Sequence, residues 1–258
     1  MTFTEEQLLG YLATFIWPFL RMGSMFITIP VFGVSIVPAR VRVMAGLLIT
    51  IVILPTLPAI PTVEIFSFQG WMIAMQQIML GMCSGFILQM VLSIMLFAGQ
   101  SIAYSMGLGF ASMVDPSTGV QVPVIAQLFV IASSFIFLSV NGHLLLIEML
   151  AQSFHTLPVS MLGFEKTDLW RIIIWSSQIF ADGLLLALPI MATMLFVNIS
   201  FGVASKAAPQ LQIFGVGFPI TIIIGMLLIW VGVPSIIDGF TDMLQDSYTF
   251  ISQLLRLN

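Results

Sequence analysis

Long runs of apolar residues alternate with short polar segments along the chain. The runs cover residues 8–37, 43–61, 66–98, 124–154, 171–200 and 213–237. A run of about 20 apolar residues is long enough to cross a bilayer as a helix. The pattern therefore predicts an all-α, integral-membrane-type protein with about six long apolar helices. Because no repeat of fixed period is present, we treat residues 1–258 as a single domain.

Prolines predict where these helices bend or end. Pro18 and Pro30 interrupt the first run, and three prolines between residues 55 and 61 end the second one. The run 66–98 contains neither proline nor a charged residue. As a straight helix it would rise about 50 Å, whereas the hydrocarbon core is about 30 Å thick. We therefore expect kinked hairpins, with the third helix tilted, bent or extended into a larger helical assembly.

Composition excludes several classes of protein. The chain is 59% hydrophobic and 7% charged, whereas a soluble domain has about 25% charged residues. The net charge of −4 includes no basic patch, so no nucleic-acid partner is expected. Cys83 is the single cysteine and excludes an internal disulfide. The acidic start, with Glu5 and Glu6, does not fit a signal peptide, so we expect the first apolar run to be retained.

The positions of the basic residues predict an orientation in the membrane. Six spans put the basic side chains on two sides: Arg40, Arg42 and Lys206 on one, and Lys166, Arg171 and Arg256 on the other. The early pair dominates the positive-inside rule, which places the loop 38–42 in the cytoplasm and both termini outside.

The central connection is a candidate for function. Residues 107–123 read GLGFASMVDPSTGVQVP, and the whole segment 99–123 lacks Lys and Arg. Such weakly charged, glycine-rich backbone between apolar helices indicates a segment at membrane depth that is buried in protein or lines a cavity. The pattern predicts a gate, plug or filter, whose candidate residues are Gly107, Gly109, Phe110, Met113, Asp115 and Pro116.

Polar residues recur every seven positions in the fourth run. They are Gln127, Ser134, Asn141, Glu148 and His155. Seven residues are close to two helical turns, so we expect one polar face that avoids lipid. Two interpretations stay open: hydrogen bonding between packed helices, or the lining of a lumen or subunit interface.

One charge lies inside an apolar run and needs a partner. Arg21 is costly to bury in an apolar helix unless a counter-charge or water accompanies it. Glu148 and Asp182 are the candidate partners. A buried ion pair and an ion pathway both remain open.

The third run carries methionines at 72, 75, 79 and 82, all on one helical face. Methionine suits surfaces that adapt to varied partners, but it also fills ordinary cores, and we keep both interpretations. Gly81 and Gly85 on the same helix permit close approach of another helix.

No catalytic or cofactor-binding motif is present. The chain lacks GxxxxGK[ST] and HExxH, the motifs of phosphate-binding loops and of zinc proteases. Ser84 lies in a GMCSG segment without the GxSxG frame of a nucleophile. We therefore expect no enzyme activity and no cofactor.

Several long motifs occur in a familiar order. They are PVFGVSIVPARVR (30–42), MGLGFASMVDPSTG (106–119), FLSVNGHLLLIEMLAQSFHTLP (137–158), LLLALPI (184–190) and SKAAPQLQIFGVGFPIT (205–221). Together they resemble the FliR family, the flagellar biosynthetic proteins of the type III export gate. The resemblance extends from about residue 8 to residue 235.

The resemblance implies a non-enzymatic subunit of a protein-conducting channel in the inner membrane and the flagellar basal body. The implied partners are several FliP and FliQ subunits, FlhB, FlhA, membrane lipid and the unfolded rod, hook and filament proteins. It also implies a FliP-like part up to about residue 165, followed by a FliQ-like hairpin and tail. The segment around 107–120 would be the plug, with Phe110 and Met113 as filler.

Two other classes of function remain as alternatives. A secondary transporter of a small solute would also use broken helices and polar groups within the membrane. An intramembrane enzyme would need a nucleophile and a base, which the sequence does not supply.

Overall fold

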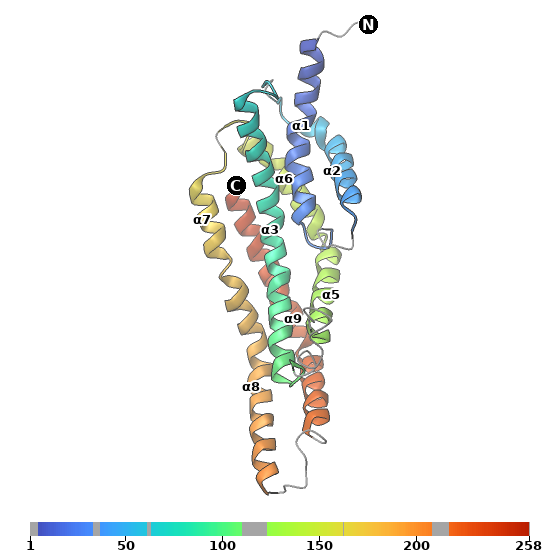
Figure 1. Ribbon diagram of the computed structural model, residues 1–258, viewed down its shortest axis with the longest axis vertical. Coiled ribbons are helices and arrows are strands. Elements are labelled where there is room, and N and C mark those ends of the chain that lie inside the picture. The colour runs from blue at the N-terminus through green and yellow to red at the C-terminus, as the bar shows by residue number, and fades with distance from the viewer. Residues whose placement is uncertain are drawn as a thin grey trace. The chain divides into compact units, whose positions relative to one another are not determined.

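The computed structural model describes residues 5–32, 37–60, 63–109, 123–161, 163–207 and 217–257. Its described part is helical and contains no β-strand, which confirms the predicted all-α class (Figure 1). The elements are α1 (Glu5–Thr28), α2 (Ala39–Ile53), the 3₁₀ turn η1 (Leu54–Thr56), α3 (Phe68–Ser105), α5 (Val124–Ser139), α6 (Gly142–Thr156), α7 (Lys166–Trp175), α8 (Gln178–Ala207) and α9 (Phe218–Leu254).

Four helical segments are long and apolar enough to cross a membrane. They are Ala39–Thr56, Phe68–Ser105, Lys166–Lys206 and Phe218–Leu254. The pair α5 and α6, bent by 58°, would make a fifth. The helix of the first apolar run, α1, is not among the four; it continues through Pro18 and ends at Thr28. Among the described residues, four to five helices thus have the length and composition of membrane spans.

The third helix is longer than any bilayer requires. α3 contains 38 residues, which corresponds to a rise of about 57 Å against about 30 Å of hydrocarbon. The predicted excess length is thus confirmed, and the helix must tilt, bend or extend beyond the hydrocarbon.

The chain divides into two compact units. Unit 1 contains residues 1–90, 137–175 and 244–258, and unit 2 contains residues 91–136 and 176–243. Both units draw on segments before and after residue 165, where the sequence predicts a boundary between a FliP-like and a FliQ-like part. That assignment stays a prediction.

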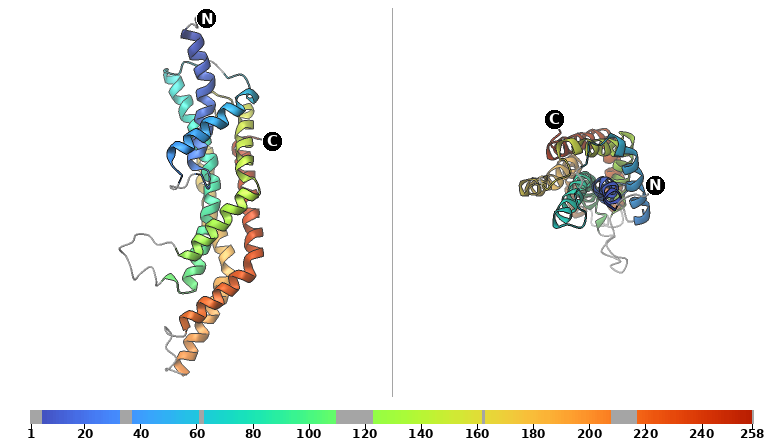
Figure 2. Two further views of the ribbon diagram at one scale, coloured as in Figure 1. Left: turned by 90° about the vertical axis from the view of Figure 1, so that its right-hand side faces the viewer. Right: turned by 90° about the horizontal axis from the view of Figure 1, so that it is seen from above.

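In unit 1, α1 packs against α2 and against the N-terminal half of α3. Figure 2 shows α1 and α2 side by side. On α3, a Cβ atom at Gly81 would collide with the Arg21 carbonyl, and one at Gly85 would lie 2.9 Å from the Ile29 amide nitrogen. The two glycines are therefore needed for the contact between α1 and α3, as their spacing predicts.

In unit 2, small residues bring the helices together. A Cβ at Gly99 of α3 would lie 2.7 Å from the Cα atom of Ala126 in α5. One at Gly183 of α8 would lie 3.1 Å from the Ile94 carbonyl of α3. The core of this unit consequently depends on backbones that approach each other closely.

Candidate functional site

The glycine-rich segment begins where α3 ends. Gly107 has a φ of 83°, a left-handed conformation that glycine adopts without steric cost. Its amide donates to the Tyr104 carbonyl over 3.0 Å, and the Leu108 amide donates to the Ala103 carbonyl over 3.0 Å. These two bonds form a Schellman cap, which satisfies carbonyls at the end of the helix.

Two side chains from the last helices hold the same helix end. Asn198 Nδ2 of α8 donates to the Ser105 carbonyl over 3.1 Å, and Thr221 Oγ1 of α9 lies 3.4 Å from the Met106 carbonyl. Sequence reasoning missed both residues. Their signal was a hydrogen-bonding side chain within an apolar run, which a single sequence does not distinguish from helix-to-helix packing.

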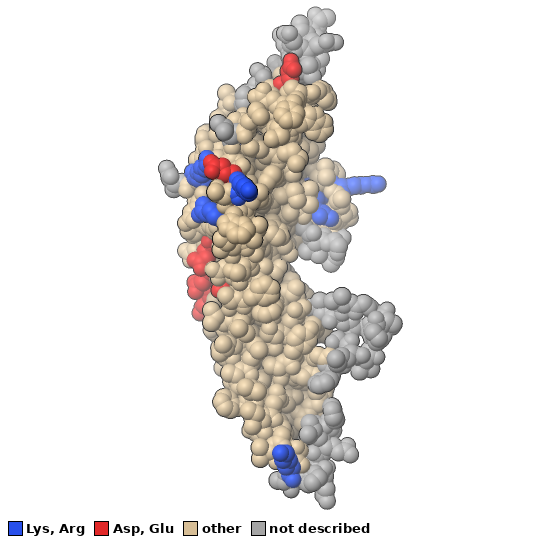
Figure 3. All heavy atoms as spheres, turned by 60° about the vertical axis from the view of Figure 1, so that its left-hand side comes forward, with Lys and Arg blue, Asp and Glu red and all other residues tan. Residues whose placement is uncertain are grey.

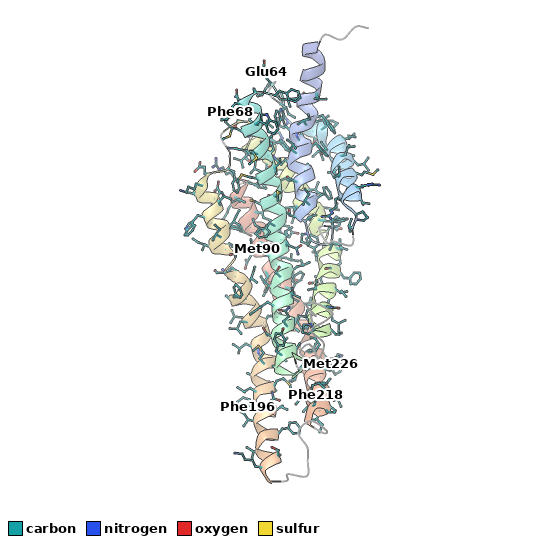
Figure 4. The ribbon with its side chains drawn as sticks, viewed as in Figure 1. Glu64, Phe68, Met90, Phe196, Phe218 and Met226 are labelled. Atoms are coloured by element: carbon teal, nitrogen blue, oxygen red, sulfur yellow. The ribbon has the colours of Figure 1, made fainter. Side chains whose placement is uncertain are left out.

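A cavity of about 310 Å³ adjoins this helix end. Tyr104, Asn198 and Thr221 line it together with Phe201 and Phe218. Figure 4 shows Phe218 near the start of α9. Asn198 donates one amide hydrogen to the Ser105 carbonyl, and the Thr221 hydroxyl also lies 2.8 Å from the Phe218 carbonyl of its own helix. The polar side chains that line the cavity thus take part in hydrogen bonds at the helix ends.

The rest of the candidate plug lies outside the described residues. This applies to Phe110, Met113, Asp115 and Pro116, whereas Gly109 is described and lies against the Tyr104 ring. The role of the segment stays a prediction.

The polar heptad does not lie on one continuous helix. α5 ends at Ser139, and Asn141 has a φ of 56° before α6 begins. Gln127 and Ser134 therefore belong to α5 and to unit 2, whereas Glu148 and His155 belong to α6 and to unit 1. The expectation of a single helical face is wrong, because Asn141-Gly142 tolerates the backbone turn that breaks it.

The members of the heptad are mostly on the surface of the chain. Gln127, Asn141, Glu148 and His155 are exposed, and Ser134 is half-buried. The Glu148 carboxylate accepts a hydrogen bond from Gln152 Nε2 over 3.2 Å. These polar groups therefore lie at the surface of the chain and not in its core.

Arg21 is completely buried in unit 1, with 0% of its side chain exposed. Nε donates to Gln77 Oε1 over 2.8 Å, one terminal nitrogen donates to Ser153 Oγ over 2.9 Å, and the other donates to the Leu157 carbonyl over 2.9 Å. The Phe154 ring stacks on the guanidinium, 3.9 Å from the carbon at its centre. We call these residues the Arg21 cluster.

The acceptors in the Arg21 cluster are all neutral. Among the described residues, one salt bridge is found, and it joins Arg256 to Glu165. Arg21 does not bind Glu148, so the predicted pairing of these two residues is wrong. Asp182, the other predicted partner, belongs to unit 2. Burial lowers the pKa of the Arg21 guanidinium to about 9, so the group remains charged at neutral pH. A charge satisfied by dipoles within a core indicates a structural role rather than an ion pathway.

The predicted cytoplasmic residues fall in different units. Arg40 and Arg42 lie in the first turn of α2 in unit 1, and Lys206 lies in the last turn of α8 in unit 2. Arg40 and Lys206 are exposed. Most of the surface in Figure 3 is neither acidic nor basic.

No candidate metal centre emerges from the residues that the structure describes, since no three His, Cys, Asp or Glu side chains come together there. The interactions found among these residues are helix packing, helix capping and the burial of the Arg21 guanidinium.

Comparison with known proteins gives one family. Residues 12–247 match the family described as bacterial export proteins, family 1. The chain is 35% identical to the flagellar biosynthetic protein FliR of Escherichia coli (strain K12), over 98% of this chain and 96% of that protein. It is 34% identical to FliR of Pectobacterium carotovorum, over 99% and 97%, and 28% identical to FliR of Bacillus subtilis, over 87% of each.

These matches cover nearly the whole chain, including the ordered motifs and the long apolar helices. The relatives are named for flagellar biosynthesis and the family for export, and neither name indicates catalysis. The chain therefore belongs to the FliR family of flagellar biosynthetic proteins, within bacterial export protein family 1.

Proposed function

We propose that this chain is a non-enzymatic subunit of the channel through which flagellar type III export moves unfolded rod, hook and filament proteins. It would form the channel with several copies of FliP and FliQ. FlhB would lie at the cytoplasmic side, FlhA nearby, and the complex in the inner membrane within the basal body.

The observation that carries this proposal is the amount of apolar surface that the chain leaves uncovered. Of the most apolar windows of the α7–α8 segment and of α9, 17% and 11% are buried. Exposed side chains include Leu185, Phe196 and Trp230, at 66%, 71% and 76%. Lipid can cover some of this surface, but α3 exceeds the thickness of the hydrocarbon core by about 27 Å. A subunit of a larger assembly explains both facts.

The test is assembly. In cells that lack their own FliR, this chain should restore motility and secretion of hook protein. Co-expressed with FliP and FliQ, it should purify as one complex that is larger than the chain alone and contains all three proteins. A chain that restores motility but purifies alone or as a homo-oligomer would contradict the channel, and solute uptake by it would favour the transporter.

The central segment is the proposed plug. Removal of residues 110–117 should leave the complex assembled and let small ions pass, because Gly107 and the cap on α3 would remain. Measurement of ion conductance in cells tests this. A deletion complex that assembles and is as tight as wild type would count against the plug.

The cytoplasmic loops are the proposed contacts with FlhB. Single cysteines at positions 40 and 206 should form crosslinks with cysteines on FlhB. Reaction of both positions with a reagent confined to the periplasm would reverse the proposed orientation.

The polar residues of α5 and α6 are proposed to face neighbouring subunits or the channel lumen. Polar groups without partners in hydrocarbon cost several kcal/mol each. Glu148→Leu should then reduce export or assembly more than Ser139→Leu does. Equal effects of the two changes would remove this assignment.

A further inference from the structure

Six large apolar side chains form a stripe along the part of α3 that belongs to unit 1. We call it the Phe/Met stripe: Phe68, Met72, Met75, Met79, Met82 and Phe86. Phe68, Met75 and Phe86 are 80%, 59% and 47% exposed, and Figure 4 shows Phe68 close to Glu64, where α3 begins. The residues alternate in steps of four and three, the spacing that lets one helix pack along another.

The face of α3 away from the stripe has the same spacing and is already packed. Its buried members are Ile73, Gln77, Leu80, Ser84 and Ile87, and Arg21 of α1 donates to Gln77 on this face over 2.8 Å. α3 therefore carries two seams for helices. The chain fills one of them with α1, and among the described residues the other is largely exposed. Met72, Met75 and Met82 are exposed and Met79 is half-buried. Within this chain these methionines therefore do not fill a core, and the interpretation of the sequence that remains is a surface that adapts to partners.

The surroundings of the stripe argue against lipid as its cover. Gln76, next to Met75, donates from Nε2 to the Met161 carbonyl over 2.7 Å. That carbonyl belongs to the non-helical connection between α6 and α7, which also contains Gly163 and Glu165.

The same connection carries an exposed ion pair. Glu165 binds Arg256 over 3.1 Å, with side chains 66% and 48% exposed. Irregular backbone and charged pairs are not found against lipid in the hydrocarbon region; they need protein or water around them. Lipid is therefore excluded as the neighbour of this connection, and the apolar side chains in the middle of the stripe, which lie beside it, need protein around them.

We propose that the Phe/Met stripe is the docking surface for an uncharged α-helix of another subunit of the export channel. The steps of three and four select a helix that crosses α3 at a shallow angle of about 20°. α3 has no charged residue from Phe68 to Ser105, so the contacting face of the partner has no counter-charge to meet. The stripe is about 27 Å long and gives way to Gln89 and Ser93 at the next positions of the repeat.

Methionine suits this surface because its flexible side chain adapts to the shape of the partner. The inference rests on the proposed function, since it requires a multi-subunit channel, but it concerns one face of one helix. It is tested separately from the channel itself.

A photo-crosslinking scan along α3 tests the proposal. A photoreactive amino acid is placed singly at Met75 and Met82 on the stripe and at Ile78 on its flank, in the full chain expressed with the flagellar export proteins. Motility of each strain shows whether the chain functions. Yields at 75 and 82 should exceed the yield at 78 about tenfold, and mass spectrometry should identify the crosslinked peptide as an uncharged helical segment of a different export protein.

Other crosslinks would overturn the proposal in distinct ways. Attachment to a second copy of this chain would make the stripe a homo-oligomer contact. Attachment to lipid alone, or no difference between 75 and 78 in motile strains, would remove it as a protein surface. If even the unsubstituted chain fails to restore motility, the proposed function fails instead.

A charge pair gives a second test that does not need the crosslinker. Met75→Lys places an unpaired charge in the seam, whereas Gln69→Lys adds the same charge to the exposed surface of the same helix. Met75→Lys should reduce co-purification of the partner subunits about tenfold or more, and Met75→Leu and Gln69→Lys should not. Equal recovery with Met75→Lys and Gln69→Lys, at equal amounts of folded chain, would overturn the proposal.

Discussion

Each of the two compact units is stabilised internally, and the main contacts inside unit 1 differ from those inside unit 2. Unit 1 contains six of the seven basic residues, whereas unit 2 contains Lys206. In unit 1, polar side chains connect segments that are far apart in the sequence, as Arg21 does for α1, α3 and α6. In unit 2, small residues such as Gly99 let helices approach, and Asn198 and Thr221 close the end of α3.

The two kinds of contact restrict the packing of the helices in different ways, one through the directions of hydrogen bonds and the other through the fit of packed surfaces. Hydrogen bonds to a buried charge tolerate few arrangements, because each acceptor must point at a particular nitrogen. Close packing tolerates few substitutions, because an added methyl group meets backbone. Unit 1, which combines the Arg21 cluster with the close approach at Gly81 and Gly85, should therefore be sensitive to the loss of a polar group as well as to added volume. Unit 2 should be sensitive mainly to added volume.

The largest effect is expected in unit 1 for Arg21→Met. The change leaves Gln77 Oε1, Ser153 Oγ and the Leu157 carbonyl without their donor inside the core. An unsatisfied buried polar group costs about 1–3 kcal/mol, so unfolding should become easier by about 3 kcal/mol or more. The midpoint of thermal unfolding in detergent and the amount of folded chain in membranes measure this.

Two further variants sharpen the interpretation. Arg171→Met removes an exposed arginine that donates to Gln253 over 3.0 Å and should change stability by less than about 1 kcal/mol. Replacing Arg21, Gln77 and Ser153 together by apolar residues should recover part of the loss, because well-packed apolar groups can replace a buried polar cluster. A single Arg21→Met variant that melts like wild type would show that the cluster does not hold unit 1 together.

The parts of the fold that sequence predicted are those encoded locally. The interruption of the first run near Pro30 and the contact at Gly81 and Gly85 follow from the special geometry of proline and glycine. Pro18, in contrast, does not end α1, and α3 continues beyond the predicted run 66–98 to Ser105. The uncharged length of α3 was equally visible, because composition alone determines it.

The parts that sequence did not predict depend on contacts between distant segments. The acceptors of Arg21 lie 56 to 136 residues away and are neutral. From the sequence, a buried arginine is expected to pair with a carboxylate, so neutral acceptors were not predicted. The break at Asn141 was hidden because the polar heptad continues through it. The role of Asn198 depends on the packing of α8 against the end of α3, which its local sequence does not indicate.

In unit 2, the informative change adds a single methyl group. Gly99→Ala would place a Cβ 2.7 Å from the Ala126 backbone, so α3 and α5 must separate at a cost of about 1–3 kcal/mol. At Gly202 of α8, nothing lies within 4 Å of a new Cβ, and Gly202→Ala should stabilise the helix by up to about 1 kcal/mol. Thermal unfolding in detergent should therefore move in opposite directions for the two variants.

The two variants are expected to shift the unfolding midpoint in opposite directions, so a general effect of Gly→Ala substitution cannot explain both results. Both changes are Gly→Ala within helices, so their intrinsic helix propensities change equally and the packing term alone differs. If Gly99→Ala raises the midpoint as Gly202→Ala does, close approach of backbones does not define unit 2.

The smallest effect is expected for the exposed ion pair of unit 1. Arg256 binds Glu165 over 3.1 Å, with both side chains about half or more in solvent, and exposed pairs contribute about 0.2–1 kcal/mol. Arg256→Gln should therefore lower the unfolding midpoint by no more than about 4 °C, and by less in high salt, which screens the pair in the wild type. Glu165→Gln and the double variant complete a cycle whose coupling energy should stay below about 1 kcal/mol. A loss as large as that of Arg21→Met would mean that the C-terminal end of α9, rather than the Arg21 cluster, holds unit 1 together.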